Sequence, residues 1–187
     1  MSDSHGNLWG MGSNSEGQLG SSISSGDKSL KKIDWPFQDK IKTFSCGKLH
    51  LVVLTFSGQV YASGSNASGQ IGCKGIQRSN SFVKISLTEP VIKIATGYAH
   101  TILLTSIKFL FVLTFFLKNH VESHSVFTLG SNVYHQLGSK TKSSDSNKIV
   151  KFEINDGPVS KIAGGGYHTF IVTTNGNLWC CGACFFQ

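Results

Sequence analysis

Three histidines are the residues of this chain best suited to chemistry by type and spacing. His50, His100 and His168 each stand three positions after a glycine and directly before a strand-like apolar stretch. A histidine can act as a general base or a metal ligand because it changes charge near neutral pH. Each one, however, holds the same place in a recurring pattern, and equivalent positions of a repeat protein lie on different units. We therefore predict structural histidines bonded to the backbone rather than a catalytic centre.

The cysteines and the glycine-rich loops provide no stronger candidate. Cys181 and Cys184 have a Cys-x-x-Cys spacing with Cys180 beside them, but a structural zinc site needs four ligands and no second pair follows. The segment 138–141 has the wrong spacing for a loop that cradles phosphate. We predict no catalytic residue, no metal site and no cofactor, and the partner-binding residues stay unassigned.

Two motifs alternate along the chain in one register. The first, GSNSEGQLG in its first copy, is found at residues 12–20, 64–72 and 130–138. The second, which ends in the three histidines, is found at residues 41–50, 91–100 and 159–168. Gly12 and Gly64 are 52 residues apart, and so are Gly130 and Gly182, where a fourth copy begins. Two independent motifs that share one period predict tandem structural repeats.

The first motif consists of residue types that favour a tight turn. Its glycines predict positive φ or close backbone approach. We expect its asparagines to bond nearby backbone and its glutamines to satisfy main-chain groups that the turn leaves unpaired. These residues are Asn14, Asn66 and Asn132, followed by Gln18, Gln70 and Gln136, with Leu19, Ile71 and Leu137 as expected core anchors. The third copy has His135 where the others have Gly17 and Gly69, which predicts a strained or different turn.

Short stretches rich in β-branched and aromatic residues predict strands between these turns. In the second unit they are residues 82–85, 91–95, 100–105 and 126–129. Four strands in about fifty residues indicate one propeller blade. The predicted fold class is therefore all-β, with about three blades of an incomplete propeller over residues 1–187. The expected repeat units are 12–63, 64–129 and 130–181, followed by the broken start of a further repeat at 182–187.

One segment interrupts the period. The distance from the motif histidine to the next motif glycine is 14 residues after His50 but 30 residues after His100. Residues 106–125 therefore replace an ordinary hairpin turn, and they include an apolar run at 109–117 that is shorter than the roughly 20 residues of a membrane span. A partner-binding hairpin would explain the insert. We favour sequence read through by mistake, such as a retained intron, because an exposed apolar run is an aggregation hazard.

Composition and charge limit the partner and the compartment. The chain has 187 residues, 40% of them hydrophobic, and a net charge of +7 that would suit acidic partners. Its basic residues are scattered, so a soluble lysine-rich surface is favoured over a nucleic-acid or chromatin site, which stays open. The polar start lacks a secretory pattern, and five cysteines are an odd number for a disulfide framework. We predict an intracellular protein, cytoplasmic or nuclear, without a membrane span.

The two motifs and the triplet Leu8-Trp9-Gly10 resemble the regulator of chromosome condensation repeat family over essentially the whole chain except the insert. The resemblance implies four-stranded blades, usually about seven in a closed ring, and three repeats are too few to close it. The family includes exchange factors for the Ran GTPase and propellers that serve as interaction domains in ubiquitin ligases and kinases. We predict a non-catalytic protein-interaction module and not an enzyme. The alternative is a guanine-nucleotide exchange factor for a Ran-like small GTPase.

Overall fold

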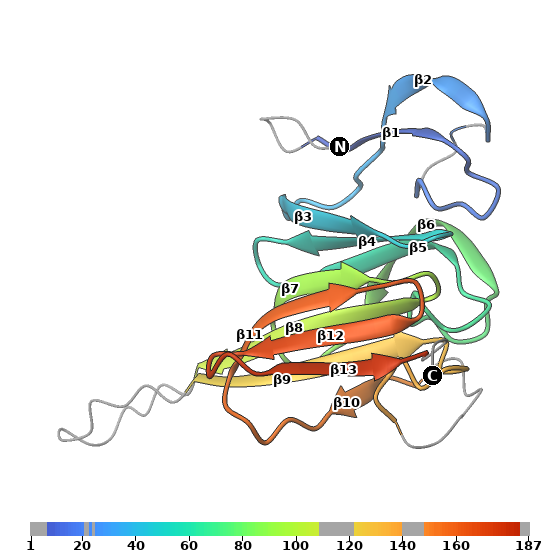
Figure 1. The fold of residues 1–187 in the computed structure, drawn as a ribbon. Coiled ribbons are helices and arrows are strands. Elements are labelled where there is room, and N and C mark those ends of the chain that lie inside the picture. Colours follow the sequence, from blue (N-terminus) through green and yellow to red (C-terminus); the bar gives the residue numbers. More distant parts are fainter. Residues whose placement is uncertain (1–6, 21–22, 24, 109–121, 140–147, 184–187) are drawn as a thin grey trace.

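The chain folds into β-strands joined by tight turns (Figure 1). The structure is a computed structural model that describes residues 7–20, 23, 25–108, 122–139 and 148–183. Its strands are β1 (Trp9–Gly12), β2 (Asp27–Lys32), β3 (Ile41–Cys46), β4 (His50–Thr55), β5 (Val60–Ser65), β6 (Arg78–Ile85), β7 (Val91–Thr96), β8 (His100–Lys108), β9 (Glu122–Gly130), β10 (Val150–Phe152), β11 (Val159–Gly164), β12 (His168–Thr173) and β13 (Leu178–Gly182). The predicted all-β class is confirmed. Within the described ranges, no helix is long and apolar enough to cross a membrane.

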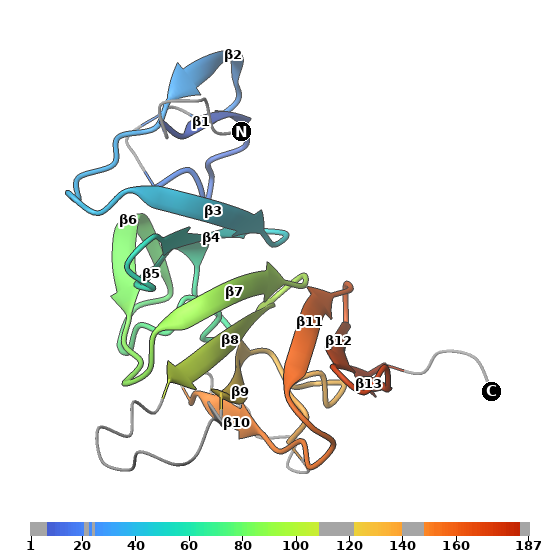
Figure 2. The ribbon, with the colours of Figure 1, turned by 90° about the vertical axis from the view of Figure 1, so that its left-hand side faces the viewer.

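The strands form antiparallel sheets that follow chain order. Two of the sheets have four strands, β3 to β6 and β7 to β10, as expected of propeller blades. The pair β1–β2 and the three-stranded sheet β11–β12–β13 stand on either side of them. In Figure 2 the sheets spread outward from their first strands, β3, β7 and β11. The strand β7 contacts both β3 and β11. The described residues therefore form an arc of an incomplete propeller.

Counted from the first-motif glycine, one predicted sequence unit contributes strands to two neighbouring sheets. Residues 12–63 contain β2, β3, β4 and most of β5. The strand β2 pairs with β1 as β6 pairs with β5, so it corresponds to the fourth strand of a sheet, whereas β3 to β5 are the first three strands of the next one. This stagger joins neighbouring sheets through the covalent chain. The unit boundaries themselves stay a prediction.

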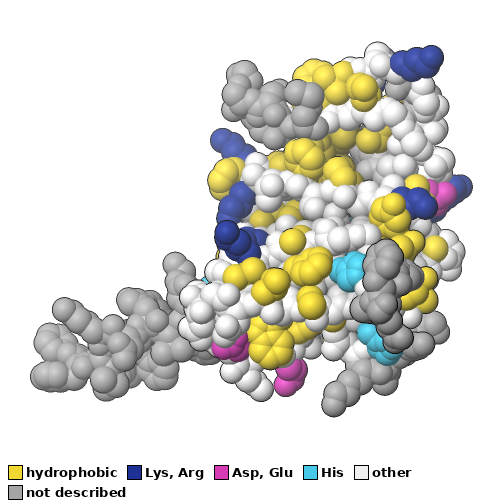
Figure 3. All heavy atoms as spheres, in the orientation of Figure 1, with side chains coloured by type: hydrophobic (Ala, Val, Ile, Leu, Met, Phe, Trp, Pro, Cys, Tyr) yellow, Lys and Arg dark blue, Asp and Glu magenta, His cyan; other side chains and the backbone are white. Residues whose placement is uncertain are grey.

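Apolar side chains from facing sheets fill the seams between them. The strand β4 is buried along its whole length because its two faces pack against different neighbours. Val53 belongs to the cluster that includes Leu8 and Ile33, which flank the pair β1–β2. Val52 and Leu54 belong to the cluster that reaches Leu103 of β8. When a strand is covered on both faces, its sequence is a continuous apolar run and does not alternate between apolar and polar residues. Charged side chains lie mainly along the edges of the face in Figure 3.

The hairpin that carries the insert is longer at its base than the sequence predicted. The strands β8 and β9 pair without interruption as far as Lys108 opposite Glu122. The strands that flank the insert therefore pair as a hairpin, and residues 106–108 and 122–125 of the predicted insert continue those strands and are not loop. The apolar run at 109–117 lies outside the described residues, and both explanations of the insert stay predictions.

Candidate interaction surface

Each copy of the first motif forms a loop held by its own asparagine. Asn66 Oδ1 accepts a hydrogen bond from the backbone amide of Ile71 at 3.2 Å, and Asn66 Nδ2 donates one to the carbonyl oxygen of Ile76 at 2.8 Å. The side-chain oxygens of Asn14 and Asn132 likewise accept a hydrogen bond from the backbone amide five residues later, each at 2.9 Å. The predicted role of the asparagines is confirmed, and it is structural.

The glutamines satisfy the main chain of the same loops. Gln70 Oε1 accepts a hydrogen bond from the amide two residues earlier, that of Ser68, at 2.9 Å. Gln18 and Gln136 make the equivalent bond at 3.0 Å and 2.9 Å. The amide side chains are thus used inside the loops, as predicted.

The third loop keeps its conformation although a histidine replaces the glycine. The φ angles of Gly17 and Gly69 are 80° and 78°, and that of His135 is 62°. A side chain in this left-handed region is strained. His135 Nδ1 lies 3.2 Å from the carbonyl oxygen of Ser139, a contact that ties the ring to its own loop. Of the two predicted outcomes, the structure has the strained turn.

The motif histidines lie at the seams between sheets, beneath the hairpin loops. His50 and His100 are only 1% and 0% exposed. His50 Nε2 lies 3.1 Å from Thr101 Oγ1, in the next sheet. His100 Nε2 lies 3.2 Å from both the carbonyl oxygen of His168 and Thr169 Oγ1. The predicted backbone bond is therefore confirmed for His100. A backbone hydrogen bond with His100 also acts on the His50 ring, beside its contact with Thr101.

In two of the three copies a threonine follows the motif histidine and completes a seam, whereas Leu51 follows His50. Thr101 Oγ1 donates to the carbonyl oxygen of Gln70 at 2.8 Å, and Thr169 Oγ1 donates to that of Gln136 at 2.7 Å. Because each hydroxyl proton is already used, each threonine oxygen accepts from the histidine Nε2, which therefore carries the ring proton. Sequence reasoning assigned no role to these threonines. The recurring His-Thr pair was the available signal.

Burial keeps two of these histidines neutral and unsuited to catalysis. Desolvation is the main cause that lowers the pKa of His50 and His100 from 6.5 to about 4. In the part of the chain that the structure describes, Nδ1 of each has no hydrogen-bond partner, so a proton there would bring a buried charge without an acceptor. His168 Nε2 bonds the carbonyl oxygen of Ala183, which again links a motif histidine to the backbone beyond it.

The two terminal cysteines that the structure describes, Cys180 and Cys181, show no metal-binding arrangement. Burial raises the pKa of the Cys181 thiol to about 11, which disfavours the thiolate that binds metal or attacks a substrate. Cys181 Sγ lies 3.4 Å from the carbonyl oxygen of Gln136, Cys180 is exposed, and Cys184 lies outside the described residues. No group of three or more His, Cys, Asp or Glu side chains that could hold a metal is found among the residues described.

Acidic side chains anchor the turns at the opposite end of the strands. Asp39 accepts a hydrogen bond from Ser57, Glu89 accepts one from Thr105, and Asp156 accepts one from Trp179 at 3.0 Å. The Ser57 and Trp179 bonds are the leading causes that lower the pKa of Asp39 and of Asp156. These acids recur before β3, β7 and β11, a regularity that the sequence analysis missed.

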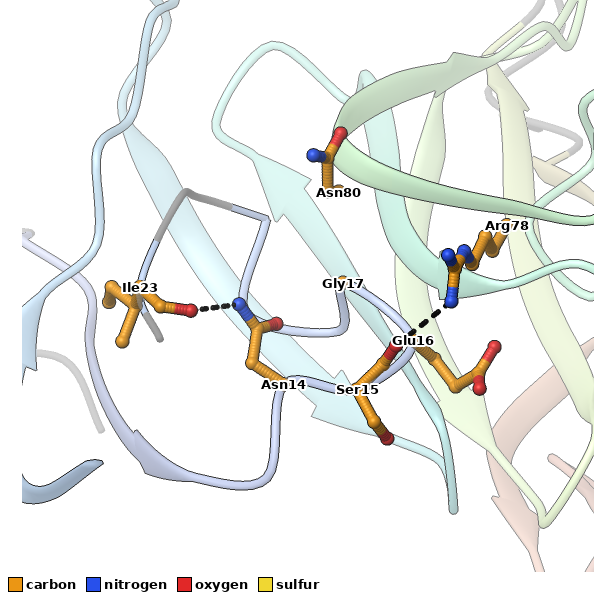
Figure 4. Close-up of a pocket in the computed structure, with 7 residues that line it drawn as sticks. All are labelled: Asn14, Ser15, Glu16, Gly17, Ile23, Arg78 and Asn80. Carbon is orange, nitrogen blue, oxygen red and sulfur yellow. Dashed lines mark hydrogen bonds between the residues drawn. The ribbon is translucent and has the colours of Figure 1, made fainter. Parts of the chain in front are cut away.

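A polar hollow of about 430 Å³ marks the joint between the first motif loop and β6 (Figure 4). Arg78 Nη1 donates to the carbonyl oxygen of Ser15 at 3.2 Å across this joint. A side chain at Gly17 would come within 2.5 Å of Asn80 Cα, so glycine is required there by close approach as well as by φ. Glu16 also lines the hollow. The Arg78–Ser15 bond and the close approach at Gly17 hold the first motif loop against β6, so this region is best explained as a contact between two sheets.

The outer surface of the hairpin loops joins three sheets into one platform. The backbone amide of Lys48 donates to the carbonyl oxygen of Tyr98 at 3.1 Å, and that of Tyr98 donates to Gly166 at 3.0 Å. The ring of Tyr167 lies edge-on to Tyr98, with centroids 5.3 Å apart, and 5.0 Å from the ring of Tyr134. Lys48 Nζ lies 5.4 Å from the centroid of Tyr98.

We call Lys48, Tyr98, Tyr134 and Tyr167 the loop patch. Its tyrosines are 46%, 38% and 36% exposed in that order. Exposed tyrosines gathered in one place are typical of protein interfaces, where a rigid ring and a hydroxyl serve apolar and polar contacts together. The sequence held a partial signal for the patch, since the position after the second-motif glycine is Lys48 in one copy and Tyr98 in the next. Only the structure shows that Tyr134 and Tyr167, from other positions of the repeat, meet them.

Comparisons with known proteins agree with this architecture. The model of the regulator of chromosome condensation repeat matches residues 41–70 and 159–183, and a second model of the same repeat matches residues 57–104. The chain belongs to the regulator of chromosome condensation repeat family. The matched segments contain the second motif and the hairpins built on it, which are the parts that form the seams.

The relatives that this chain matches are proteins of several kinds. The mouse regulator of chromosome condensation is 32% identical over 92% of this chain and 38% of its own length. A nematode homologue of the X-linked retinitis pigmentosa GTPase regulator is 30% identical over 76% of this chain and 9% of its own length. The human probable E3 ubiquitin-protein ligase HERC3 is 30% identical over 74% of this chain and 12% of its own length. The chain thus spans well under half of the relatives it matches.

Solved structures share the fold. Human WBSCR16 superposes with a TM-score of 0.76 and 24% identity, over 93% of this chain and 42% of its own. Prp20p from Saccharomyces cerevisiae, studied with its binding to Gsp1p and histones, gives a TM-score of 0.74 and 24% identity over 97% and 40%. The incomplete propeller of this chain is therefore a portion of a known architecture.

Proposed function

We propose that this chain is a protein-interaction module of the regulator of chromosome condensation repeat family that acts by binding and not through a catalytic centre. The loop patch is the observation that carries the proposal. It gathers exposed tyrosines on loops that backbone hydrogen bonds hold together, while the motif histidines that could do chemistry are used in the seams. A preformed aromatic surface loses little conformational freedom on binding.

Exchange activity on a Ran-like small GTPase is the second candidate. It is supported by a relative named as a GTPase regulator homologue. Exchange also works by binding, because the protein must favour the nucleotide-free state of the GTPase. We expect little exchange activity from this chain alone, since a binding face drawn from several blades would be incomplete with so few. We place the protein inside the cell, in the cytoplasm or nucleus.

Two measurements test the proposal. Immobilised wild-type chain and a Tyr98→Ala/Tyr167→Ala variant serve as matched baits for cell extract, with retained proteins identified by mass spectrometry. The module predicts proteins that wild type retains and the variant loses; identical sets would contradict it. In the second measurement, rapid release of labelled GDP from Ran at substoichiometric chain would favour exchange activity instead. Fluorescence microscopy of the tagged chain tests its location.

A further inference from the structure

We infer that the loop patch binds an acidic segment of a partner protein that presents an apolar side chain between its carboxylates. This inference rests on the proposed function, because it names the partner chemistry of the surface that carries that function. Three properties of the platform point to it: its rigidity, its charge and the arrangement of its rings.

The platform is rigid because its loops are fixed from both sides. On the outside, backbone hydrogen bonds link Lys48 to Tyr98 and Tyr98 to Gly166. On the underside, the buried rings of His50 and His100 fill the space directly below the loop glycines. The tyrosine backbones are therefore held in place before a partner arrives, which favours recognition of a defined segment.

The charge of the platform is positive. Lys48 is exposed beside the rings. The loops around the patch contain no Asp or Glu; they are residues 46–50, 65–77, 96–100, 130–139 and 164–168. Glu16 of the first motif loop lies at this end as well, but in the hollow that Arg78 also lines. A carboxylate would meet the Lys48 ammonium, whereas a lysine or arginine of a partner would meet a like charge.

The tyrosine rings suit a mixed polar and apolar ligand. The edge-on packing of Tyr167 against Tyr98 and Tyr134 spreads the three rings over one area. Val133, which is 64% exposed, adds an apolar neighbour in the same loop as Tyr134. Ring faces and Val133 can pack against an apolar side chain, and phenolic hydroxyls can donate to carboxylate oxygens.

A nucleic acid fits this surface less well than an acidic peptide. Nucleic-acid affinity comes largely from neutralising many phosphates in a row, and the loop patch contains a single cation, Lys48. One ammonium and three tyrosines match one or two carboxylates around an apolar residue. We therefore expect nucleic acid to bind more weakly than an acidic peptide, and the test measures both.

The test uses fluorescein-labelled peptides and the full chain. The probe is a short peptide with glutamates on both sides of one phenylalanine. One control peptide has lysine in place of each glutamate, another has alanine in place of the phenylalanine, and oligothymidylate represents nucleic acid. We expect the glutamate–phenylalanine peptide to bind at least about tenfold more tightly than any control by fluorescence anisotropy, with affinity that falls as salt rises.

Substitutions locate the binding. Tyr98→Ala and Tyr167→Ala should each weaken the probe about tenfold, and Lys48→Glu should favour the lysine peptide instead. Phe56→Ala removes an aromatic side chain, 69% exposed, from the turn at the opposite end of the strands, and it should leave binding unchanged. Unaltered melting temperatures show that each variant is folded.

The outcomes separate this inference from the proposed function. Equal or tighter binding of the lysine peptide or of oligothymidylate overturns the inference, as does no binding of the probe at millimolar concentration. If the bait experiment still shows partners that depend on the tyrosines, the interaction module stands and only the acidic partner is wrong. If the baits retain identical sets of proteins while the probe binds, the module proposal fails by itself.

Discussion

On the underside of the three hairpin loops every copy places a histidine, whereas their outer surface has a lysine in one copy and tyrosines in the other two. The underside residues, His50 and His100, are almost completely buried and bond to the next sheet. On the outer surface, Lys48 and Tyr98 share one backbone position, two residues before the histidine, but differ in chemistry. The third copy has Gly166 at that position and Tyr167 directly after it. The seam restricts the residue type because its geometry repeats. The outer surface is free of that restriction, so it is where partner choice can be encoded.

The largest expected effect comes from filling the space beneath a loop. A Cβ at Gly97 would overlap the ring of His100 and the carbonyl oxygen of Gly165. Gly97→Ala should therefore lower the free energy of unfolding by about 3 kcal/mol or more, measured by urea denaturation. Gly166→Ala is the matched control, because a Cβ there would meet only the Tyr98 ring at 3.8 Å, an ordinary contact, and its φ is not positive. Equal losses in both variants would mean that the underside is not tightly packed.

Acid should weaken the underside next most strongly. The pKa of His50 and His100 is about 4 in the folded state and 6.5 without burial. Unfolding therefore takes up protons below pH 6.5, so this stability is present above pH 6.5 and is lost as pH falls toward 4. Each histidine should remove up to about 1.4 kcal/mol per pH unit in that window. Urea midpoints that stay constant between pH 7 and pH 4.5 would contradict the buried neutral state.

Removing one seam histidine should cost stability but not binding. His100→Ala removes one of the two donors to the carbonyl oxygen of His168, which keeps the Gly165 amide, and it empties a fully buried site. We expect a loss of about 1–3 kcal/mol in the free energy of unfolding. Thermal unfolding gives the stability, and anisotropy with the glutamate–phenylalanine peptide gives the binding below the melting temperature. An unchanged melting temperature together with lost binding would assign this histidine to the functional surface.

The smallest effect is expected at the third motif loop. His135→Gly removes a side chain from the left-handed region but also removes its contact with the carbonyl oxygen of Ser139. The relief of about 1 kcal/mol or more and the lost hydrogen bond of similar size should nearly cancel. The melting temperature should therefore change by a few degrees at most. A large loss would show that the imidazole holds more than its own turn.

Much of the fold follows from spacing along the chain. The features that predicted it are local: the strand-like runs, the Asn and Gln positions of the motif, and the 52-residue period at which they recur. Short-range hydrogen bonds, such as those of Asn66 with Ile71 and of Gln70 with Ser68, form the predicted turns. The glycine positions likewise predicted where φ turns positive. The seams were only half predictable, because the partner of His50 is a threonine 51 residues further on in another sheet.

By itself the sequence determined the repeat, the all-β class and the turns, since each of these depends on residues a few positions apart. Only the tertiary structure decided which side chains meet across sheets. Tyr98, Tyr134 and Tyr167 are brought together because successive loops stack at one end of the strands. Pairing up to Lys108 and Glu122 likewise depends on two strands separated by the insert. Contacts between distant segments are set by how sheets pack, and a one-dimensional pattern specifies the packing faces but not the partners that each exposed residue finds.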